Sequence, residues 1–223
     1  MFPNVTDLEQ PAFNPADRLF YVSVLSSGRN PGGSICTLDI AALSIACTYP
    51  LPDCVPAGIV FWPKNHLFIG CSESQITDYG YSASYIMAVS TGNVILNISG
   101  LTGIDQVAYD SAANLFYASA YQNLGTADTP LPQIAVVNAS SGTLIQTLPT
   151  DNVTAHSVAV DGRTGLMLVP IKNQGIVAYS LKAGMMSSGR LPTNGMITSG
   201  AMKGTIEVLM ASIAIGIAGL VML

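Results

Sequence analysis

The chain has 223 residues, and its 8 Lys and Arg against 13 Asp and Glu give a formal net charge of −5. A weakly charged acidic chain is not expected to bind nucleic acid, whose phosphates select basic surfaces. Hydrophobic residues make up 49% of the chain and charged residues only 9%, so intrinsic disorder is excluded and a packed core is expected.

The N-terminal segment, residues 1–12, has no basic stretch and no apolar run, so it predicts no secretory signal. Asn-x-Ser/Thr triplets nevertheless predict N-glycosylation and an extracellular location. These acceptor sites are Asn4, Asn97, Asn138 and Asn152. We therefore expect the sequence to begin downstream of the true start of the protein.

Four similar hairpin segments recur along the chain at intervals of roughly 50 residues, the spacing of repeat proteins. In each, an apolar strand enters a polar turn and a second apolar strand leaves it. The segments are Phe13–Val22, Ile59–Gly70, Val107–Ala118 and Val158–Val169, and they share a leucine at positions 19, 67, 115 and 166.

A second recurrence follows each hairpin and begins at Ile35, Ile86, Ile134 and Ile176. In the first three repeats a short turn and another strand come next, so four antiparallel strands are expected per unit. Four strands in about 40 to 50 residues are typical of a β-propeller blade. The sequence predicts an all-β fold of three complete blades and a partial fourth, over residues 13–58, 59–106, 107–157 and 158–182.

The loops between the second and third strands, over residues 26–34, 72–84 and 122–132, are rich in Ser, Gly, Pro and Asp. We expect partner specificity to lie in these loops.

The four cysteines are even in number and clustered, and no Cys-x-x-Cys or Cys/His pattern suggests zinc. Two disulfides are expected, and three pairings are possible. Cys36 and Cys47 fall opposite each other across the outer hairpin of the first repeat, so we pair Cys36 with Cys47 and Cys54 with Cys71. Four inert buried thiols are the alternative.

The repeats resemble the propeller group that includes the YVTN, NHL and gluconolactonase-like proteins. The residues that carry the resemblance are His156–Asp161 and Thr164–Val169, and more loosely Leu19–Ser23 and Leu115–Ser119. The resemblance covers about Phe13 to Leu181 and implies six or seven blades. Either the chain is the C-terminal half of a longer propeller, or it closes with four blades and residues near Val5 supply the last outer strand.

In gluconolactonase-like propellers, carboxylate and amide groups at the mouth of the channel hold a divalent cation such as calcium. By blade position the resemblance places Asp105, Gln106 and His156 at that mouth. A hard cation requires about six oxygen ligands, and this set offers too few. We therefore expect no cofactor and no metal site, we assign no catalytic residue, and we interpret His156 as a loop histidine.

Three other features have structural interpretations. Asp110 and Asp161 recur at equivalent turns and are expected to cap backbone N–H groups there. Trp62 is expected to pack between blades. His66 is expected to be a solvated residue of a hairpin turn.

The C-terminal region divides into a Ser/Gly/Pro-rich linker, residues 183–204, and an apolar segment, residues 205–223, expected to be helical. Small residues ahead of an apolar tail are typical of a glycolipid-anchor signal, as in fungal surface proteins. Ser199 is the first candidate attachment site and Asn194 the second. A retained membrane helix and a buried core helix are the alternatives.

Together these features predict a glycosylated β-propeller at the cell surface or outside the cell, attached to the membrane through its C-terminal tail. We expect a non-catalytic binding or structural module whose ligand is a protein or a carbohydrate. The alternative is a metal-dependent gluconolactonase-like hydrolase whose site is completed by further blades.

Overall fold

The computed structural model describes residues 8–25, 32–123, 131–150, 155–172 and 175–180. The chain divides into one compact unit over residues 1–177 and a second over residues 178–223. Almost all described residues belong to the first unit. The predicted linker and C-terminal helix lie outside the described residues.

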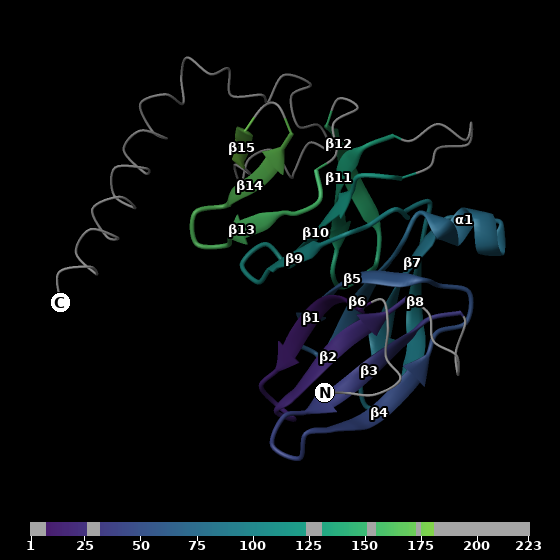
Figure 1. Cartoon of the computed structure of the whole chain (residues 1–223). Helices are drawn as coiled ribbons and strands as arrows, with labels where there is room; N and C mark the ends of the chain where they lie inside the picture. Colours follow the sequence, from purple (N-terminus) through teal and green to yellow (C-terminus); the bar gives the residue numbers. More distant parts are fainter. Residues whose placement is uncertain (1–7, 26–31, 124–130, 151–154, 173–174, 181–223) are drawn as a thin grey trace, which may run out of the picture. The chain divides into compact units, whose positions relative to one another are not determined.

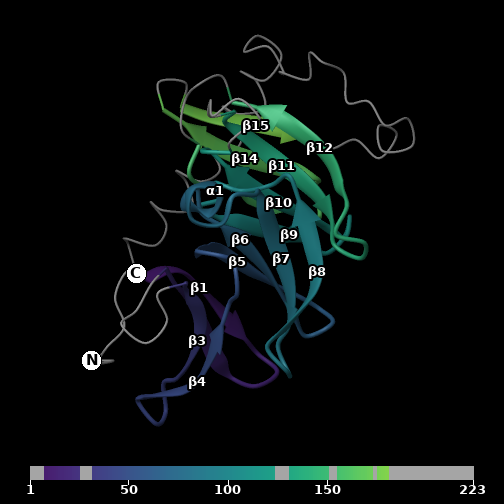
Figure 2. The ribbon, with the colours of Figure 1, turned by 90° about the vertical axis from the view of Figure 1, so that its right-hand side faces the viewer.

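Four antiparallel sheets follow one another along the chain (Figures 1 and 2). The first consists, in order, of β1 (Leu8–Asn14), β2 (Leu19–Val24), β3 (Ser34–Asp39) and β4 (Ser44–Pro50). The second consists of β5 (Pro56–Trp62), β6 (His66–Cys71), β7 (Ala83–Ala88) and β8 (Asn93–Ser99), with the short helix α1 (Ser74–Tyr79) between β6 and β7. The third consists of β9 (Val107–Asp110), β10 (Leu115–Ala120), β11 (Gln133–Asn138) and β12 (Leu144–Pro149). The fourth consists of β13 (Ala159–Asp161), β14 (Leu166–Ile171) and β15 (Gly175–Ser180).

The prediction of an all-β chain with four antiparallel strands in three repeats and fewer in the last is confirmed. Strand β1 begins at Leu8, so residues 8–12, predicted to precede the first blade, belong to the first sheet.

In the first, third and fourth sheets the first strand of the first hairpin ends at a polar residue, Asn14, Asp110 or Asp161, whereas in the second sheet it ends at Trp62. The Oδ1 atom of Asp110 accepts the N–H groups of Ala112 and Ala113, at 2.8 and 3.1 Å. Asp161 accepts the N–H of Arg163 in the same way, at 3.0 Å. An Asp or Asn that binds the backbone two residues on forms a turn without further support. The prediction that both aspartates cap turns is confirmed.

The strand register corrects the alignment of the second repeat. The turn between β5 and β6 is one residue shorter than the others, so Trp62 lies opposite His66. In the first sheet Asn14 lies opposite Leu19 and Phe13 opposite Phe20. His66 therefore occupies the position of Leu19, and the leucine at 67 that seemed shared occupies the position of Phe20.

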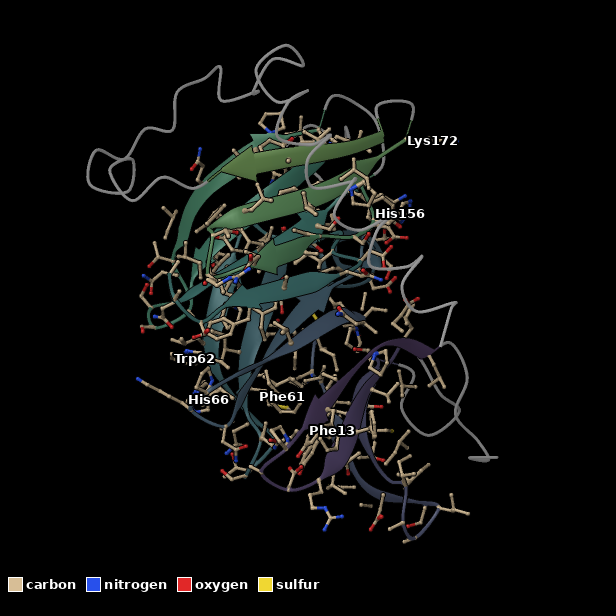
Figure 3. The ribbon with its side chains drawn as sticks, turned by 90° about the vertical axis from the view of Figure 1, so that its left-hand side faces the viewer. Phe13, Phe61, Trp62, His66, His156 and Lys172 are labelled. Atoms are coloured by element: carbon tan, nitrogen blue, oxygen red, sulfur yellow. A yellow bond between two sulfur atoms is a disulfide. The ribbon has the colours of Figure 1, made fainter. Side chains whose placement is uncertain are left out.

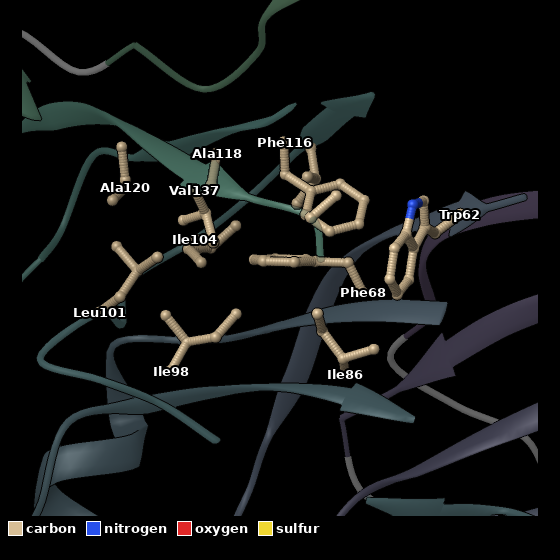
Figure 4. Close-up of a cluster of buried hydrophobic side chains, with 13 residues drawn as sticks. Trp62, Phe68, Ile86, Ile98, Leu101, Ile104, Phe116, Ala118, Ala120 and Val137 are labelled. Carbon is tan, nitrogen blue, oxygen red and sulfur yellow. The ribbon is translucent and has the colours of Figure 1, made fainter. Parts of the chain in front are cut away.

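Consecutive sheets pack through their innermost strands: β5 contacts both β1 and β9, and β9 contacts β13. Figure 4 shows the cluster between the second and third sheets, in which Phe68 lies against Phe116 with ring centroids 4.9 Å apart. Trp62 belongs to this cluster and its Nε1 donates to Asn114 of the third sheet at 3.0 Å, so its predicted role in packing between sheets is confirmed. Among the described strands, β13 and β1 do not pack as closely as the innermost strands of consecutive sheets do.

A single glutamine links the innermost strands of three sheets. The Oε1 atom of Gln10, on β1, accepts the N–H groups of Ile59 on β5 and Val107 on β9, both at 3.2 Å. Its Nε2 donates to the carbonyl of Val107 at 3.4 Å. One amide thereby satisfies strand-edge groups that would otherwise lack a partner.

The expectation of a solvated turn for His66 is wrong. This residue begins β6, its ring lies 5.3 Å from the ring of Trp62, and its Nδ1 is buried without a partner among the described residues. Burial lowers the pKa of His66, and the charge of Lys64 lowers it further.

The outer hairpins of the three complete sheets each contain one extra residue in the fourth strand, a β-bulge. In the first sheet Leu38 pairs with Ile45 but Thr37 pairs with Cys47, so the extra residue is Ala46. The corresponding extra residues of the other two sheets are Ile95 and Ile145.

This bulge explains why one predicted disulfide is wrong. Cys54 and Cys71 are bonded, as expected, with 5.5 Å between their Cα atoms. Cys36 and Cys47 are free thiols, the first buried and the second exposed. A regular hairpin would place them opposite each other, but the extra residue at Ala46 shifts the register by one, and a shift of one turns a side chain to the other face of the sheet.

The bulge also predicts which position could form a disulfide with Cys36. Thr48 lies directly opposite Cys36, and its Oγ1 is 3.5 Å from the Cys36 Sγ. We expect the double variant Cys47→Ala, Thr48→Cys to form a second disulfide in air, because both thiols then lie on one face. Under denaturing conditions, thiol titration should find two free thiols in the wild type and none in the variant. Two free thiols in the variant would contradict the register.

Candidate functional site

Three loops bring polar side chains together at the end of the sheets where each second strand leads into the third. Asp105 precedes β9, Tyr121 follows β10, and His156 precedes β13. The Nδ1 of His156 lies 2.7 Å from the Oδ2 of Asp105, although the two residues are 51 positions apart. The ring of Tyr121 lies against the His156 ring, with centroids 4.2 Å apart. We call Glu73, Asp105, Tyr121, Gln122 and His156 the loop-end cluster.

A buried serine fixes two of these loops. Ser119, near the end of β10, accepts the N–H of Asp105 at 3.0 Å and donates its own N–H to the carbonyl of Gln106 at 2.8 Å. Its hydroxyl donates to the carbonyl of Ala155. Ser119 therefore holds the Asp105 loop through two backbone hydrogen bonds and the His156 loop through the carbonyl of Ala155.

The second part of the cluster joins the second and third sheets. The side-chain amide of Gln122 is oriented so that its nitrogen faces hydrogen-bond acceptors. This nitrogen lies 3.1 Å from each carboxylate oxygen of Glu73 and 3.2 Å from the Tyr121 hydroxyl. The N–H of Gln122 donates to the carbonyl of Gly103 at 3.2 Å. Thr102 binds the carbonyl of Ser72 at 2.7 Å, which positions the loop that carries Glu73.

The electrostatics at Tyr121 keep its hydroxyl group neutral. Burial raises the pKa of Tyr121 to about 12, and the negative charges of Glu73, Asp105 and Glu9 contribute in the same direction. At neutral pH its hydroxyl therefore carries its proton.

The His156–Asp105 pair is open to solvent, since the side chain of His156 is 54% exposed and that of Asp105 is 25% exposed. Exposed pairs of this kind contribute little to stability. The pair is therefore accessible to a ligand, and folding alone does not account for it.

A groove of about 610 Å³ opens beside His156. Pro170, Ile171 and Ile176 form its apolar walls, and Lys172 adds a positive charge. Figure 3 shows His156 and Lys172 close together at one end of the sheets, with Trp62 and His66 at the opposite end. An apolar wall beside a few polar groups is the usual composition of a ligand site.

Of the three residues expected at the channel mouth, the structure brings Asp105 and His156 into contact. Gln106 is exposed next to them, and its backbone carbonyl binds Ser119. Sequence reasoning found no partner for His156, because the carboxylate comes from another repeat. It also missed Tyr121 and Gln122, although both stand where the second strand ends and a candidate specificity loop begins.

The residues that the structure describes contain no group of three or more His, Cys, Asp or Glu side chains placed to hold a metal ion. The loop-end cluster offers Asp105 and His156 as neighbours, which is too few for a hard cation. The described residues therefore do not fit a divalent cation, and no chemical step through one follows from them.

The predicted modification sites fall in different surroundings. Asn97 is exposed on β8. Asn138 is half-buried, and its Oδ1 accepts the N–H groups of Ser140 and Ser141. The remaining predicted sites, Asn4, Asn152, Asn194 and Ser199, lie outside the described residues. Within the described part of the chain, no helix has the length and apolar character needed to cross a membrane.

No protein-family model and no curated protein matches the sequence. Among solved structures, a chain of Kuenenia stuttgartiensis hydrazine synthase is similar, with a TM-score of 0.60 and 16% sequence identity. The match covers 80% of this chain and 52% of that chain, so this chain spans about half the length of the similar structure. At this identity the likeness concerns the fold alone.

Proposed function

We propose that the four sheets are blades of a β-propeller that binds a carbohydrate at the loop-end cluster, without catalysis. Four antiparallel sheets that pack through their innermost strands support the blade interpretation. We further propose that the module acts at the cell surface as a glycosylated, membrane-attached protein. The Cys54–Cys71 disulfide and the exposed acceptor Asn97 support an oxidising extracellular setting.

The observation that carries the binding proposal is the contact of half-buried Tyr121 and Asp105 with exposed His156. An aromatic ring, a carboxylate, an imidazole and the amide of Gln122 together present a flat apolar surface beside several donors and acceptors. A sugar ring has the matching properties, with an apolar C–H face and hydroxyl groups at its edge. The adjacent groove provides room for more than one ring.

The test is retention of the full-length chain, in mild detergent, on an immobilised glycan array. We expect the wild type to bind a subset of glycans, and Tyr121→Ala and His156→Ala each to reduce retention at least tenfold. Tyr81→Ala is the control for loss of a tyrosine side chain, because Tyr81 is 40% exposed and lies outside the cluster. The proposal would be contradicted if the wild type bound no glycan on the array, or if Tyr121→Ala were retained as well as the wild type.

The metal-dependent hydrolase is the competing proposal, and it requires cation ligands from outside the described residues. Its experiment is a thermal melt with calcium, zinc or manganese. A large metal-dependent rise in melting temperature would favour the hydrolase, because a ligand that binds only the folded state stabilises it. An unchanged melting temperature in all three ions would favour the binding module.

A further inference from the structure

One repeat position is buried in three sheets and exposed in the first. It is the second residue of the second strand in each sheet, and its members are Phe20, Leu67, Phe116 and Met167. Leu67, Phe116 and Met167 are 0% exposed, whereas Phe20 is 37% exposed. Phe13 lies opposite Phe20, with ring centroids 5.0 Å apart, and is 48% exposed.

The buried members show what normally covers this face. Phe61, the equivalent of Phe13 in the second sheet, lies edge-on to Tyr21 of the first sheet with centroids 5.0 Å apart. Phe116 packs in the same way against Phe68 of the second sheet. Tyr21 and Phe68 are themselves equivalent by register. At both of these boundaries a large side chain, Tyr21 or Phe68, therefore covers this face of the next sheet.

The fourth sheet carries the same kind of side chain with no sheet to cover among the described residues. Leu168 pairs with Ala159, as Tyr21 pairs with Ala12, so Leu168 occupies the Tyr21 position. Leu168 is half-buried. The first sheet thus has an uncovered face around Phe13 and Phe20, which we call the receiving face. The last sheet carries Leu168 at the position from which other sheets cover such a face.

The receiving face is also hollowed. A groove of about 540 Å³ is lined by Phe13, Leu19, Phe20 and Ile40, together with Asp17, Arg18 and Asp39. Figure 3 shows Phe13 on β1 of the first sheet. An exposed aromatic pair in a hollow is the composition expected of an interaction surface.

We propose that the fourth sheet of a second copy of this chain packs on this face, so that two copies form one closed ring of eight sheets. This inference rests on the blade interpretation in the proposed function. It continues a packing mode already present between consecutive sheets, and a ring of eight lies within the blade range of propellers. A two-fold ring uses, in both copies, the two end faces that the described sheets leave uncovered, which gives a closed assembly.

Light scattering coupled to size exclusion, with the detergent contribution subtracted, measures the mass of the full-length chain. We expect twice the chain mass of 23.2 kDa for the wild type. Phe20→Asp should lower the mass to one chain, because it places a charge in the proposed interface. Leu43→Asp is the control, since Leu43 is a 75% exposed residue of the first sheet's outer turn, and it should leave the mass doubled. Association through the apolar C-terminal segment would persist in Phe20→Asp and would overturn the proposal.

A cross-linking experiment identifies the contact itself. In a Cys47→Ala background, chains with Phe13→Cys are mixed with chains with Leu168→Cys and oxidised. We expect a disulfide-linked dimer from the mixture, at least tenfold more abundant than from either variant alone. A wild-type mass of one chain, or no mixed dimer, would overturn the proposal and indicate that a different polypeptide covers the face. Glycan retention is independent of these results, so failure here is distinguishable from failure of the binding proposal.

Discussion

Gly103→Ala is expected to destabilise the protein by more than about 3 kcal/mol, because two separate costs combine at this position. Gly103 has a φ of +65°, a backbone conformation that side chains other than hydrogen disfavour. An added Cβ would also lie 2.2 Å from backbone atoms of Gln122. Neither backbone can yield without moving the loop that carries Tyr121 and Gln122.

Gly100→Ala is the matched control. Gly100 has a similar φ of +77°, but nothing lies within 4 Å of the added Cβ. We expect a loss of only about 1 kcal/mol there, from backbone strain alone. Urea denaturation gives both free energies of unfolding. Equal losses in the two variants would show that the Gly103 loop does not approach Gln122 as closely as described.

Phe116→Ala is expected to cost about 3 to 5 kcal/mol, the range measured for truncating a fully buried phenylalanine. The Phe116 ring contacts Phe68 at 4.9 Å and Tyr109 at 5.3 Å, and it lies 6.4 Å from Trp62. The resulting cavity would lie between two sheets. Each sheet depends on its neighbour in a repeat protein, so the unfolding transition should also broaden.

Ile145→Ala controls for the loss of an apolar side chain in the same sheet. Ile145 is 50% exposed on the outermost strand β12, and its truncation should change stability by no more than about 0.5 kcal/mol. The free energy and the slope of urea denaturation check both variants. A loss for Phe116→Ala as small as that for Ile145→Ala would contradict the packing of the second sheet against the third.

The amino-acid sequence by itself determined the number and order of the strands. Alternating apolar residues and polar turns are local signals, so Asp110 and Asp161 identified their turns before any contact was known. Of the two disulfides that the sequence favoured among three possible pairings, only that between Cys54 and Cys71 is present. Asp105 and His156 were recognised as neighbours of one channel mouth because repeats place equivalent residues at equivalent ends of the sheets.

Only the tertiary structure decided the details that depend on register and on contacts between repeats. The extra residue at Ala46 leaves no clear mark in the sequence, yet it turns Cys47 away from Cys36. Gln10 binds strands 49 and 97 positions away, and Tyr121 meets His156 across a boundary between sheets. Local pattern specifies where strands begin and end, whereas bulges and long-range hydrogen bonds are selected by the packing of whole sheets.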